Sequence, residues 1–275
     1  MTIQCGSIDL QYGPSDRDRV STGTGLSFDD VLLVPQRNRI ASRRDADTSM
    51  QFTPAIRLNI PVVSANTPWC TGERMAIAMA RAGGIGIVHR MFSPAEQAAA
   101  VVATKKADPG GNPRTTVDSA GRLRVGGAVG IKSDYLDRAR LLVESKVDFL
   151  AIDVAHGHSD FVIAALKELK ARYPHLECVA GNVATAGGAR DLIEAGADCI
   201  KVGIGPGSVC TTRLVTGAGM PQLAAILDCA AVTREAGVGL IADGGIRTSG
   251  DMTKAIAAGA STVMCASAPK VVPYL

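Results

Sequence analysis

Cys210 lies in the part of the chain whose residue types are best suited to chemistry. It follows the glycine-rich run Gly203–Ser208, and Thr211-Thr212-Arg213 comes directly after it. Glycines let backbone N–H groups converge on an anion. A thiol next to fixed positive charge, such as Lys201 or Arg213 could supply, becomes a nucleophile. The run therefore predicts covalent chemistry by Cys210 on a phosphate-bearing substrate, and a buried structural cysteine is the alternative.

A second candidate is Asp243, which is followed by Gly244 and Gly245 at the end of an apolar run. An aspartate in this place accepts hydrogen bonds from both hydroxyls of a ribose, while the glycine N–H groups face a phosphate. The alternative is an aspartate that caps the next helix.

A third candidate is the segment Asp153–Ser159, which contains His156 and His158. We expect Asp153 to contact a ribose or a cofactor. A metal site at the two histidines is disfavoured because the sequence offers no evident third ligand.

Short runs rich in valine and isoleucine alternate with helical stretches from residue 60 onward, and they predict the elements that position these residues. The runs are apolar throughout, as strands buried on both faces should be. The eight predicted strands are Ile60–Ala65, Gly84–His89, Gly126–Gly130, Asp148–Asp153, Glu177–Asn182, Cys199–Gly203, Gly239–Asp243 and Ser261–Cys265.

Apolar residues at helical spacing predict the helices between these strands. The predicted helices are Arg74–Arg81, Tyr135–Ser145, Phe161–Arg172, Ala189–Glu194, Gln222–Glu235 and Asp251–Ala258. Eight strand–helix units predict one (β/α)8 barrel over residues 1–275, with a doubly wound open sheet as the alternative. The candidate residues then share the carboxyl ends of the strands, where barrel active sites lie.

Composition narrows the class of protein. The chain has 275 residues, 47% of them hydrophobic, 20% charged and 4% aromatic, with a net charge of +3. This balance gives no reason to expect nucleic acid or a membrane as a partner. Seven scattered cysteines without a CxxC pair fit neither a disulfide framework nor a zinc site, so we expect a reducing, cytoplasmic location.

Five motifs make the chain similar to the IMP dehydrogenase and GMP reductase family over nearly its whole length. They are Leu26–Pro35, Gly83–His89, Gly181–Thr185, the run Gly203–Arg213 (the Cys210 loop) and Ala242–Arg247. The resemblance implies a barrel enzyme that binds a purine nucleotide and a nicotinamide cofactor, with Cys210 attacking C2 of the purine and Thr212 activating it.

The resemblance also implies the remaining site residues. The substrate contacts are Asn66, Ser208, Asp243, Gly244, Gly245 and Ser267, with Ser208, Gly245 and Ser267 on the phosphate. The cofactor contacts are Asp153, Val154, Ala155, Gly203 and Gly205. Backbone carbonyls of Gly205, Gly207 and Cys210 match those that hold potassium in many dehydrogenase members.

The branch of the family decides the reaction. Ala65-Asn66, Gly72 and Thr216 stand beside the expected purine pocket and favour the reductase, which converts GMP and NADPH to IMP and ammonia. The segments Asp153–Ser159 and Ile246–Asp251 favour the dehydrogenase, which oxidises IMP to XMP with NAD. We expect the reductase. A nucleotide-binding scaffold without activity is a further alternative, against which Cys210 and Thr212 argue.

The resemblance has consequences for domain organisation and assembly. Residues 105–121 are a linker at the place where many members insert a pair of regulatory CBS modules, and we expect that pair to be missing here. We also expect the catalytic flap after the last strand to be absent from this chain. A homotetramer or octamer is the expected assembly.

Overall fold

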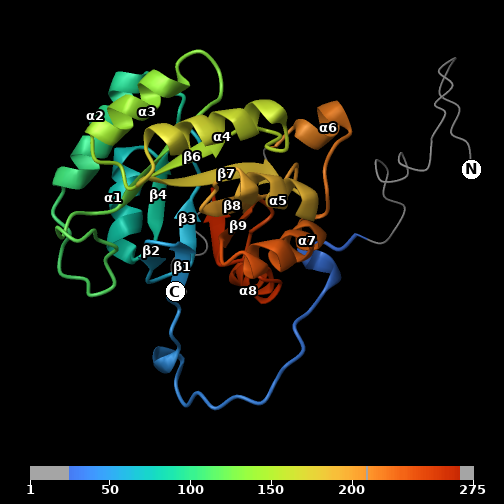
Figure 1. Ribbon diagram of the computed structural model, residues 1–275. Helices are drawn as coiled ribbons and strands as arrows, with labels where there is room; N and C mark the ends of the chain where they lie inside the picture. Colours follow the sequence, from blue (N-terminus) through green and yellow to red (C-terminus); the bar gives the residue numbers. More distant parts are fainter. Residues whose placement is uncertain (1–24, 209, 267–275) are drawn as a thin grey trace, which may run out of the picture.

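The computed structural model describes residues 25–208 and 210–266, and its centre is a closed barrel of eight parallel strands. The order around the barrel is β10-β3-β4-β5-β6-β7-β8-β9 (Figure 1). The strands are β3 (Val62–Ser64), β4 (Ile85–Val88), β5 (Val125–Val129), β6 (Phe149–Asp153), β7 (Glu177–Val183), β8 (Cys199–Val202), β9 (Gly239–Asp243) and β10 (Thr262–Cys265). The predicted barrel is confirmed, and closure of the sheet excludes the doubly wound alternative.

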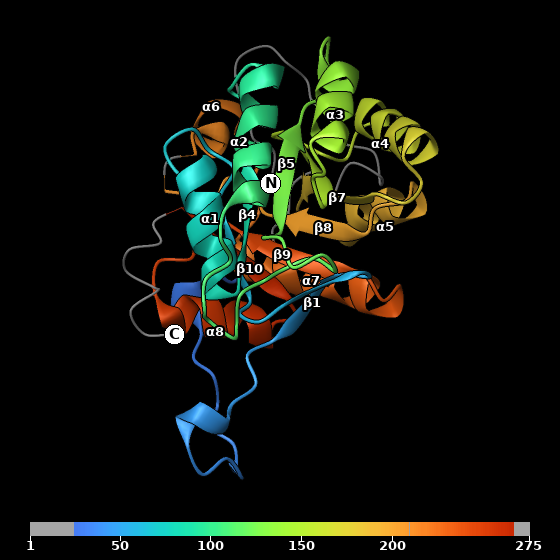
Figure 2. The same ribbon diagram turned by 90° about the vertical axis from the view of Figure 1, so that its left-hand side faces the viewer.

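Seven helices connect successive barrel strands and cover the outside of the barrel (Figures 1 and 2). They are α1 (Glu73–Ala82), α2 (Pro94–Lys106), α3 (Tyr135–Glu144), α4 (Asp160–Arg172), α5 (Ala186–Glu194), α7 (Gln222–Glu235) and α8 (Ser249–Ala257). Local capping fixes several of their ends. Ser93 and Glu96 form a capping box at the start of α2, and Thr248 and Asp251 form one at α8.

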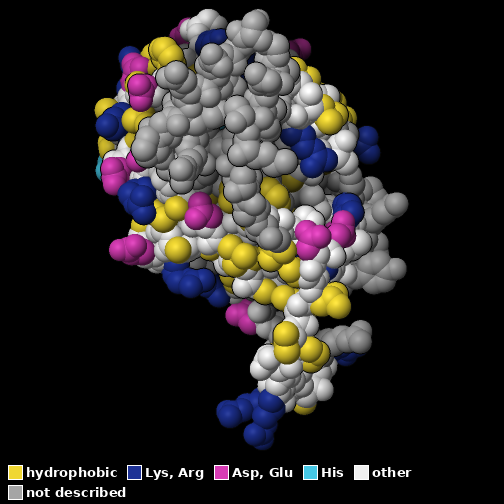
Figure 3. Space-filling view, turned by 90° about the vertical axis from the view of Figure 1, so that its right-hand side faces the viewer, with side chains coloured by type: hydrophobic (Ala, Val, Ile, Leu, Met, Phe, Trp, Pro, Cys, Tyr) yellow, Lys and Arg dark blue, Asp and Glu magenta, His cyan; other side chains and the backbone are white. Residues whose placement is uncertain are grey.

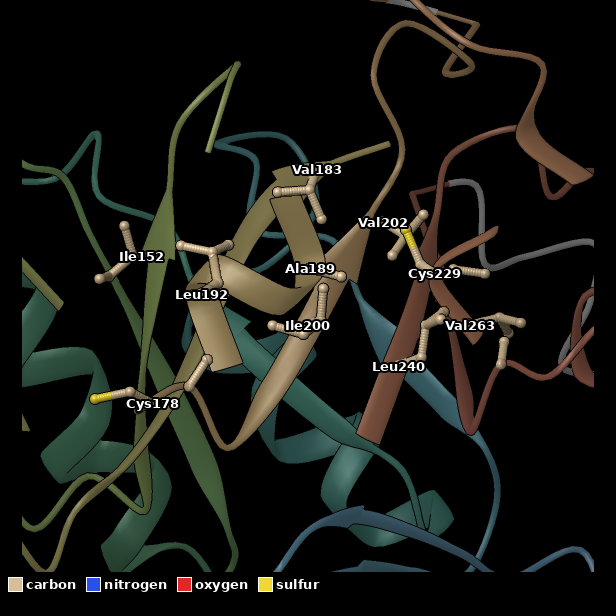
Figure 4. Close-up of a cluster of buried hydrophobic side chains, with 14 of the residues drawn as sticks. Ile152, Cys178, Val183, Ala189, Leu192, Ile200, Val202, Cys229, Leu240 and Val263 are labelled. Carbon is tan, nitrogen blue, oxygen red and sulfur yellow. The ribbon is translucent and has the colours of Figure 1, made fainter. Parts of the chain in front are cut away.

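Two sets of buried side chains, one on each face of the barrel wall, make up the core. Ile85 and Ile87 point into the barrel, whereas Val88 packs outward against helices. Figure 4 shows part of the outer set, in which Leu192 of α5 lies near Ile200 of β8. These apolar layers fix the strand ends on which polar side chains are mounted.

The end of the barrel opposite the carboxyl ends is closed by a short antiparallel hairpin. Its strands are β1 (Met50–Thr53) and β2 (Ile56–Leu58). Phe52 of the hairpin packs edge-on against Phe149 of β6, with ring centroids 5.0 Å apart. The hairpin therefore excludes water from the lower half of the barrel.

The segment between α2 and β5 also lies at this closed end. Lys105 and Lys106 belong to α2, so the stretch without regular structure begins at Ala107. The Lys105 ammonium is 3.2 Å from Asp118 and 2.6 Å from Asp148, and Arg124 also pairs with Asp148. These ion pairs fasten both ends of the predicted linker to the barrel wall, far from the carboxyl ends of the strands.

Residues 31–49 form an arm that extends away from the barrel in two perpendicular views (Figures 1 and 2). Lys and Arg side chains lie at its far end in Figure 3. The arm begins after a short 3₁₀ turn, Phe28–Asp30, whose buried Phe28 packs against the barrel core. Among the described residues, no helix is long and apolar enough to cross a membrane.

Candidate functional site

The Cys210 loop follows β8 at the carboxyl ends of the strands. Cys210 is half-buried, and its Sγ–H donates a hydrogen bond of 3.3 Å to the hydroxyl of Thr212. Thr212 is the first residue of a five-residue helix, α6 (Thr212–Thr216), which lies outside the ring of barrel helices (Figure 1). The Thr216 hydroxyl in turn donates to the Thr212 carbonyl at 2.7 Å. The loop therefore presents a thiol whose proton already has an acceptor.

The turn after β9 packs directly against the Cys210 loop. Gly244 has φ +98°, and a Cβ placed on it would lie 2.8 Å from Pro206 and 3.0 Å from the Gly207 nitrogen. Both the positive φ and the close approach favour glycine at this position. Without a side chain at Gly244, the two glycine-rich turns come together and their N–H groups border a common space.

That space is a cavity of about 980 Å³. Ser208 and Gly245, both predicted phosphate contacts, line it together with the side chains of Arg213 and Arg247. The other lining residues are Ser27, Phe28, Asp29, Pro206, Gln222, Ile246 and Ala266. Serine hydroxyl, glycine N–H and arginine groups around one cavity suit a phosphate monoester.

Asp243 ends β9 beside this cavity, and its carboxylate is held on one side only. Its Oδ2 accepts hydrogen bonds from Lys201 Nζ at 2.9 Å and from Asn182 Nδ2 at 2.8 Å. No donor among the described residues contacts Oδ1. The backbone carbonyl of Asp243 accepts from the buried Gln222 amide at 3.1 Å. Asp243 is therefore fixed in orientation and keeps an acceptor oxygen for a ligand hydroxyl.

Asp153 ends β6 and faces the same ammonium. Lys201 Nζ lies 3.1 Å from Asp153 Oδ1, and Arg90 Nε donates to the Asp153 carbonyl at 3.2 Å. Burial alone would raise the pKa of Asp153, but the Lys201 charge and hydrogen bonds from Asn66 and Lys201 outweigh it and hold that pKa below its ordinary value. Asp153 is therefore ionised at neutral pH.

A second cavity, of about 580 Å³, opens next to Asp153 and is rich in cations. Val154 lines it, with Arg90, Lys132 and Arg138 around it and Gly130, Ile131, Ser133 and Asp134 completing the wall. Arg138 is neutralised by Asp134 at 2.7 Å. Within the part of the chain that the structure describes, no carboxylate pairs with Lys132. The cavity therefore presents an unneutralised ammonium near a predicted cofactor contact.

The structure gathers most of the residues expected from the sequence at the carboxyl ends of the strands. Gly203 directly follows β8, and its carbonyl accepts from Asn182 at 2.8 Å. Ala155 is exposed in the loop after β6, and a Cβ placed on Gly205 would lie 3.0 Å from the Arg213 Cβ. His158 pairs with Asp191 at 2.7 Å. Ser267 lies outside the described residues.

Three site residues, Arg90, Asn182 and Gln222, were given no role from the sequence, and Lys201 was expected only as a positive charge near Cys210. Lys201 had a usable signal, because it is a charged residue inside the apolar strand Cys199–Val202 and is 2% exposed. A cation in that environment needs buried carboxylate partners. Asn182 and Gln222 gave a weaker signal, since buried amides occur in many cores.

The predicted potassium ligands can be compared with the local backbone. The Gly207 carbonyl accepts from the Cys210 N–H at 3.1 Å, which leaves one lone pair. The Gly205 and Cys210 carbonyls accept no hydrogen bond from the described residues. Three carbonyls with spare capacity suit a hard monovalent cation, so the donor set fits. Among the described residues, no three His, Cys, Asp or Glu side chains form a metal cluster.

Comparison with known proteins places this geometry in a family. Residues 25–268 match the model of the IMP dehydrogenase / GMP reductase domain. The chain belongs to the IMP dehydrogenase / GMP reductase family. The resemblance predicted from the sequence motifs is therefore confirmed.

Relatives from both branches of this family are similar to the chain. An inosine-5'-monophosphate dehydrogenase of Borreliella burgdorferi is 41% identical, over 88% of this chain and 69% of the relative. A GMP reductase of Leishmania donovani is 35% identical, over 87% of this chain and 73% of the relative. The crystal structure of a GMP reductase from Trypanosoma brucei superposes with a TM-score of 0.86 at 34% identity, covering 91% of this chain and 84% of that one. The comparisons thus support an oxidoreductase of purine nucleotides and do not separate the two reactions.

Proposed function

We propose that the chain is a GMP reductase, which converts GMP and NADPH to IMP, ammonia and NADP. The observation that carries the proposal is the arrangement of Asn66. Asn66 follows β3 at the carboxyl ends of the strands, where its side chain helps to lower the pKa of Asp153 and its amide carbonyl oxygen can accept a hydrogen bond from a ligand. Asn66 is 9% exposed, so an unmatched acceptor there carries a penalty.

An acceptor in this place distinguishes the two purines. GMP has an amino group on C2 that donates hydrogen bonds, whereas IMP has only a C–H there. A buried polar group favours the substrate that pairs with it and disfavours the one that does not. The Asn66 oxygen therefore supports GMP as the substrate.

The nucleotide fits the first cavity by its chemistry. Its phosphate would lie on Ser208 and Gly245 near Arg213, and its ribose hydroxyls would donate to the free Oδ1 of Asp243. This placement brings C2 of the purine toward Cys210, which lies in the same loop after β8 as Ser208. Binding in this way holds the reacting carbon near the thiol.

Cys210 and Thr212 then perform the bond exchange at C2. The Cys210 sulfur bonds to C2, its proton passes by way of the Thr212 hydroxyl to the amino group, and the C2–N bond breaks to release ammonia. When bound, NADPH would supply the hydride that C2 needs. The C2–S bond then breaks, IMP leaves, and Cys210 regains a proton from solvent.

The second cavity supports NADPH over NADH. Asp153 and Val154 would contact the dinucleotide, with Ala155, Gly203 and Gly205 in the adjoining loops. The unpaired Lys132 ammonium and the guanidinium of Arg90 would attract a phosphate group. The 2'-phosphate is the group that NADPH has and NADH lacks.

A potassium ion would be held by the carbonyls of Gly205, Gly207 and Cys210. Its contribution when bound would be to fix the conformation of the Cys210 loop.

The same proposal includes a cytoplasmic location and a homotetramer or octamer. It also includes the insertion of CBS modules at residues 105–121 in related chains. In support of the last, the alignment with the dehydrogenase of Nitrosopumilus maritimus spans 353 residues, more than the 275 of this chain.

IMP dehydrogenase is the second candidate, supported by the names of several relatives at 35–41% identity. Product analysis separates the two. With GMP and NADPH, the proposal expects IMP and ammonia in equal amounts, measured by chromatography and an ammonia assay. Formation of XMP from IMP and NAD, without any IMP from GMP, would overturn it.

A further inference from the structure

Lys201 is a buried cation shared by two carboxylates that belong to different ligand sites. Its side chain is 3% exposed, and its ammonium lies 3.1 Å from Asp153 Oδ1 and 2.9 Å from Asp243 Oδ2. Burial alone would lower the pKa of Lys201, but Asp243 and Asp153 raise it above its ordinary value. The ammonium therefore stays charged, and its attraction to both carboxylates is strong because little water screens it.

The ammonium has little freedom to move elsewhere. A Cβ on Gly181 of β7 would lie 2.7 Å from the Lys201 Cβ and 2.5 Å from its carbonyl oxygen, so the neighbouring strand already touches the base of this side chain. Each carboxylate has one more polar neighbour, because Asn182 Nδ2 donates to the same Asp243 oxygen at 2.8 Å and Arg90 Nε lies 3.8 Å from Asp153 Oδ2. The result is a continuous polar row across the mouth of the barrel.

We propose that Lys201 is a positioning residue that couples the nucleotide site to the dinucleotide site. The inference rests on the proposed function only in placing the ribose on Asp243 and the dinucleotide on Asp153, and it holds for either reaction. Because one ammonium serves both carboxylates, a change of charge at Asp243 alters how strongly Lys201 is drawn to Asp153. Binding at one site then depends on the other through Lys201.

The sign of this dependence follows from the geometry. When Asp243 is replaced by asparagine, the Lys201 ammonium pairs with Asp153 alone. Asp153 is then less available to accept hydrogen bonds from the dinucleotide. The Asp243→Asn variant should therefore bind the dinucleotide more weakly, although Asp243 faces the nucleotide.

The test measures the dissociation constants of NADPH and of NAD by calorimetry, without nucleotide, so that stacking between the ligands plays no part. In the unmutated background, Asp243→Asn should weaken dinucleotide binding about fivefold or more, the lower end of ordinary site-to-site coupling. In the Lys201→Met background the same change should have less than about a twofold effect.

Two further variants guard against a purely structural explanation. Lys201→Arg keeps the charge, so Asp243→Asn should still weaken dinucleotide binding in that background. If the fold required lysine itself at this position, the effect of Asp243→Asn would be lost in the Lys201→Arg background. Asp198→Asn removes the partner of Lys170, 2.8 Å away, at the opposite end of the barrel, and should leave dinucleotide binding unchanged. If thermal unfolding shows that Lys201→Met does not fold, the inference is tested by the effect of Asp243→Asn on dinucleotide affinity in the unmutated and Lys201→Arg backgrounds.

Two results would overturn the inference. One is unchanged dinucleotide affinity in Asp243→Asn, and the other is an equally large effect in the Lys201→Met background. The proposed reaction fails separately, by turnover of IMP with NAD in place of GMP with NADPH. In that case the dissociation constants of NAD, measured with and without Asp243→Asn, test the coupling. A chain that binds neither dinucleotide contradicts both.

Discussion

The Cys210 thiol and the Thr212 hydroxyl are the smallest unit that the proposed chemistry requires. They are 3.3 Å apart, and the cavity residues Ser208 and Gly245 lie in the adjoining turns. Bond exchange at C2 therefore depends on the sulfur, while nucleotide binding depends on the turns around it.

Replacement of Cys210 by serine separates these two roles. We expect Cys210→Ser to abolish turnover and to keep nucleotide affinity within about twofold, because a neutral hydroxyl is a far weaker nucleophile than a thiolate. Activity assays and calorimetry with GMP measure the two quantities. Cys229→Ala, a change in a buried cysteine of α7, is the control and should stay active. Substantial turnover by Cys210→Ser would remove Cys210 from the reaction.

Asp243 is predicted to bind the ribose through its free Oδ1. Asp243→Ala should weaken nucleotide binding by about 1–3 kcal/mol, the usual cost of losing a hydrogen bond to a charged group. Calorimetry with GMP and IMP measures this change. The control is Asp191→Ala, a change in α5 that removes the hydrogen-bond partner of His158. This variant should bind nucleotide normally. Equal affinities for the unmutated chain and Asp243→Ala would place the ribose elsewhere.

Lys132 is the residue expected to recognise the 2'-phosphate of the dinucleotide. Lys132→Ala should raise the KM for NADPH about tenfold and leave the KM for NADH nearly unchanged, since a charge-assisted contact contributes about 1.5 kcal/mol. Lys146, an exposed lysine beyond α3, offers a control substitution to alanine. A parallel rise in both KM values would show that Lys132 does not read the phosphate.

At the scale of elements, the carboxyl ends of the strands could be predicted because buried strands carry a distinct pattern. The ends of the eight strands differ by at most two residues from the predicted ones. The hairpin β1–β2 and the helix α6 were not predicted, because three to five residues are too few to show a period. The second helix was expected between its strands but received no bounds, since its alanine-rich sequence does not mark a face.

The ion pairs at the closed end of the barrel lead to a prediction on stability. Burial would raise the pKa of Asp118, but hydrogen bonds from Arg122 and the Lys105 charge lower it to about 2. A lowered pKa in the folded chain adds stability above the unfolded-state value near 4, and this contribution disappears as the pH falls toward 2.

The variant Asp118→Asn should therefore lower the urea midpoint at pH 7 and lose most of that difference near pH 2. Asp137→Asn, on the exposed face of α3, is the control and should give a much smaller difference than Asp118→Asn. A difference of equal size at both pH values would mean that the ionised form of Asp118 does not stabilise the fold.

At the scale of the whole molecule, the barrel and the location of its site were predictable, but the polar row through Lys201 was not. Repeated strand–helix units determine a closed barrel and place Cys210, Asp153 and Asp243 at one end. Which side chains meet there depends on barrel closure, which brings β6, β8 and β9 to a common mouth. A linear pattern does not contain those distances.

The central claim is that this barrel reduces GMP by way of a Cys210 adduct. The most direct measurement is the absorbance of reduced nicotinamide with purified protein, taken once with GMP and NADPH and once with IMP and NAD. The account predicts a steady fall in the first mixture, lost in Cys210→Ser, and no rise in the second. A steady rise with IMP and NAD, with no GMP-dependent loss of NADPH, would contradict it.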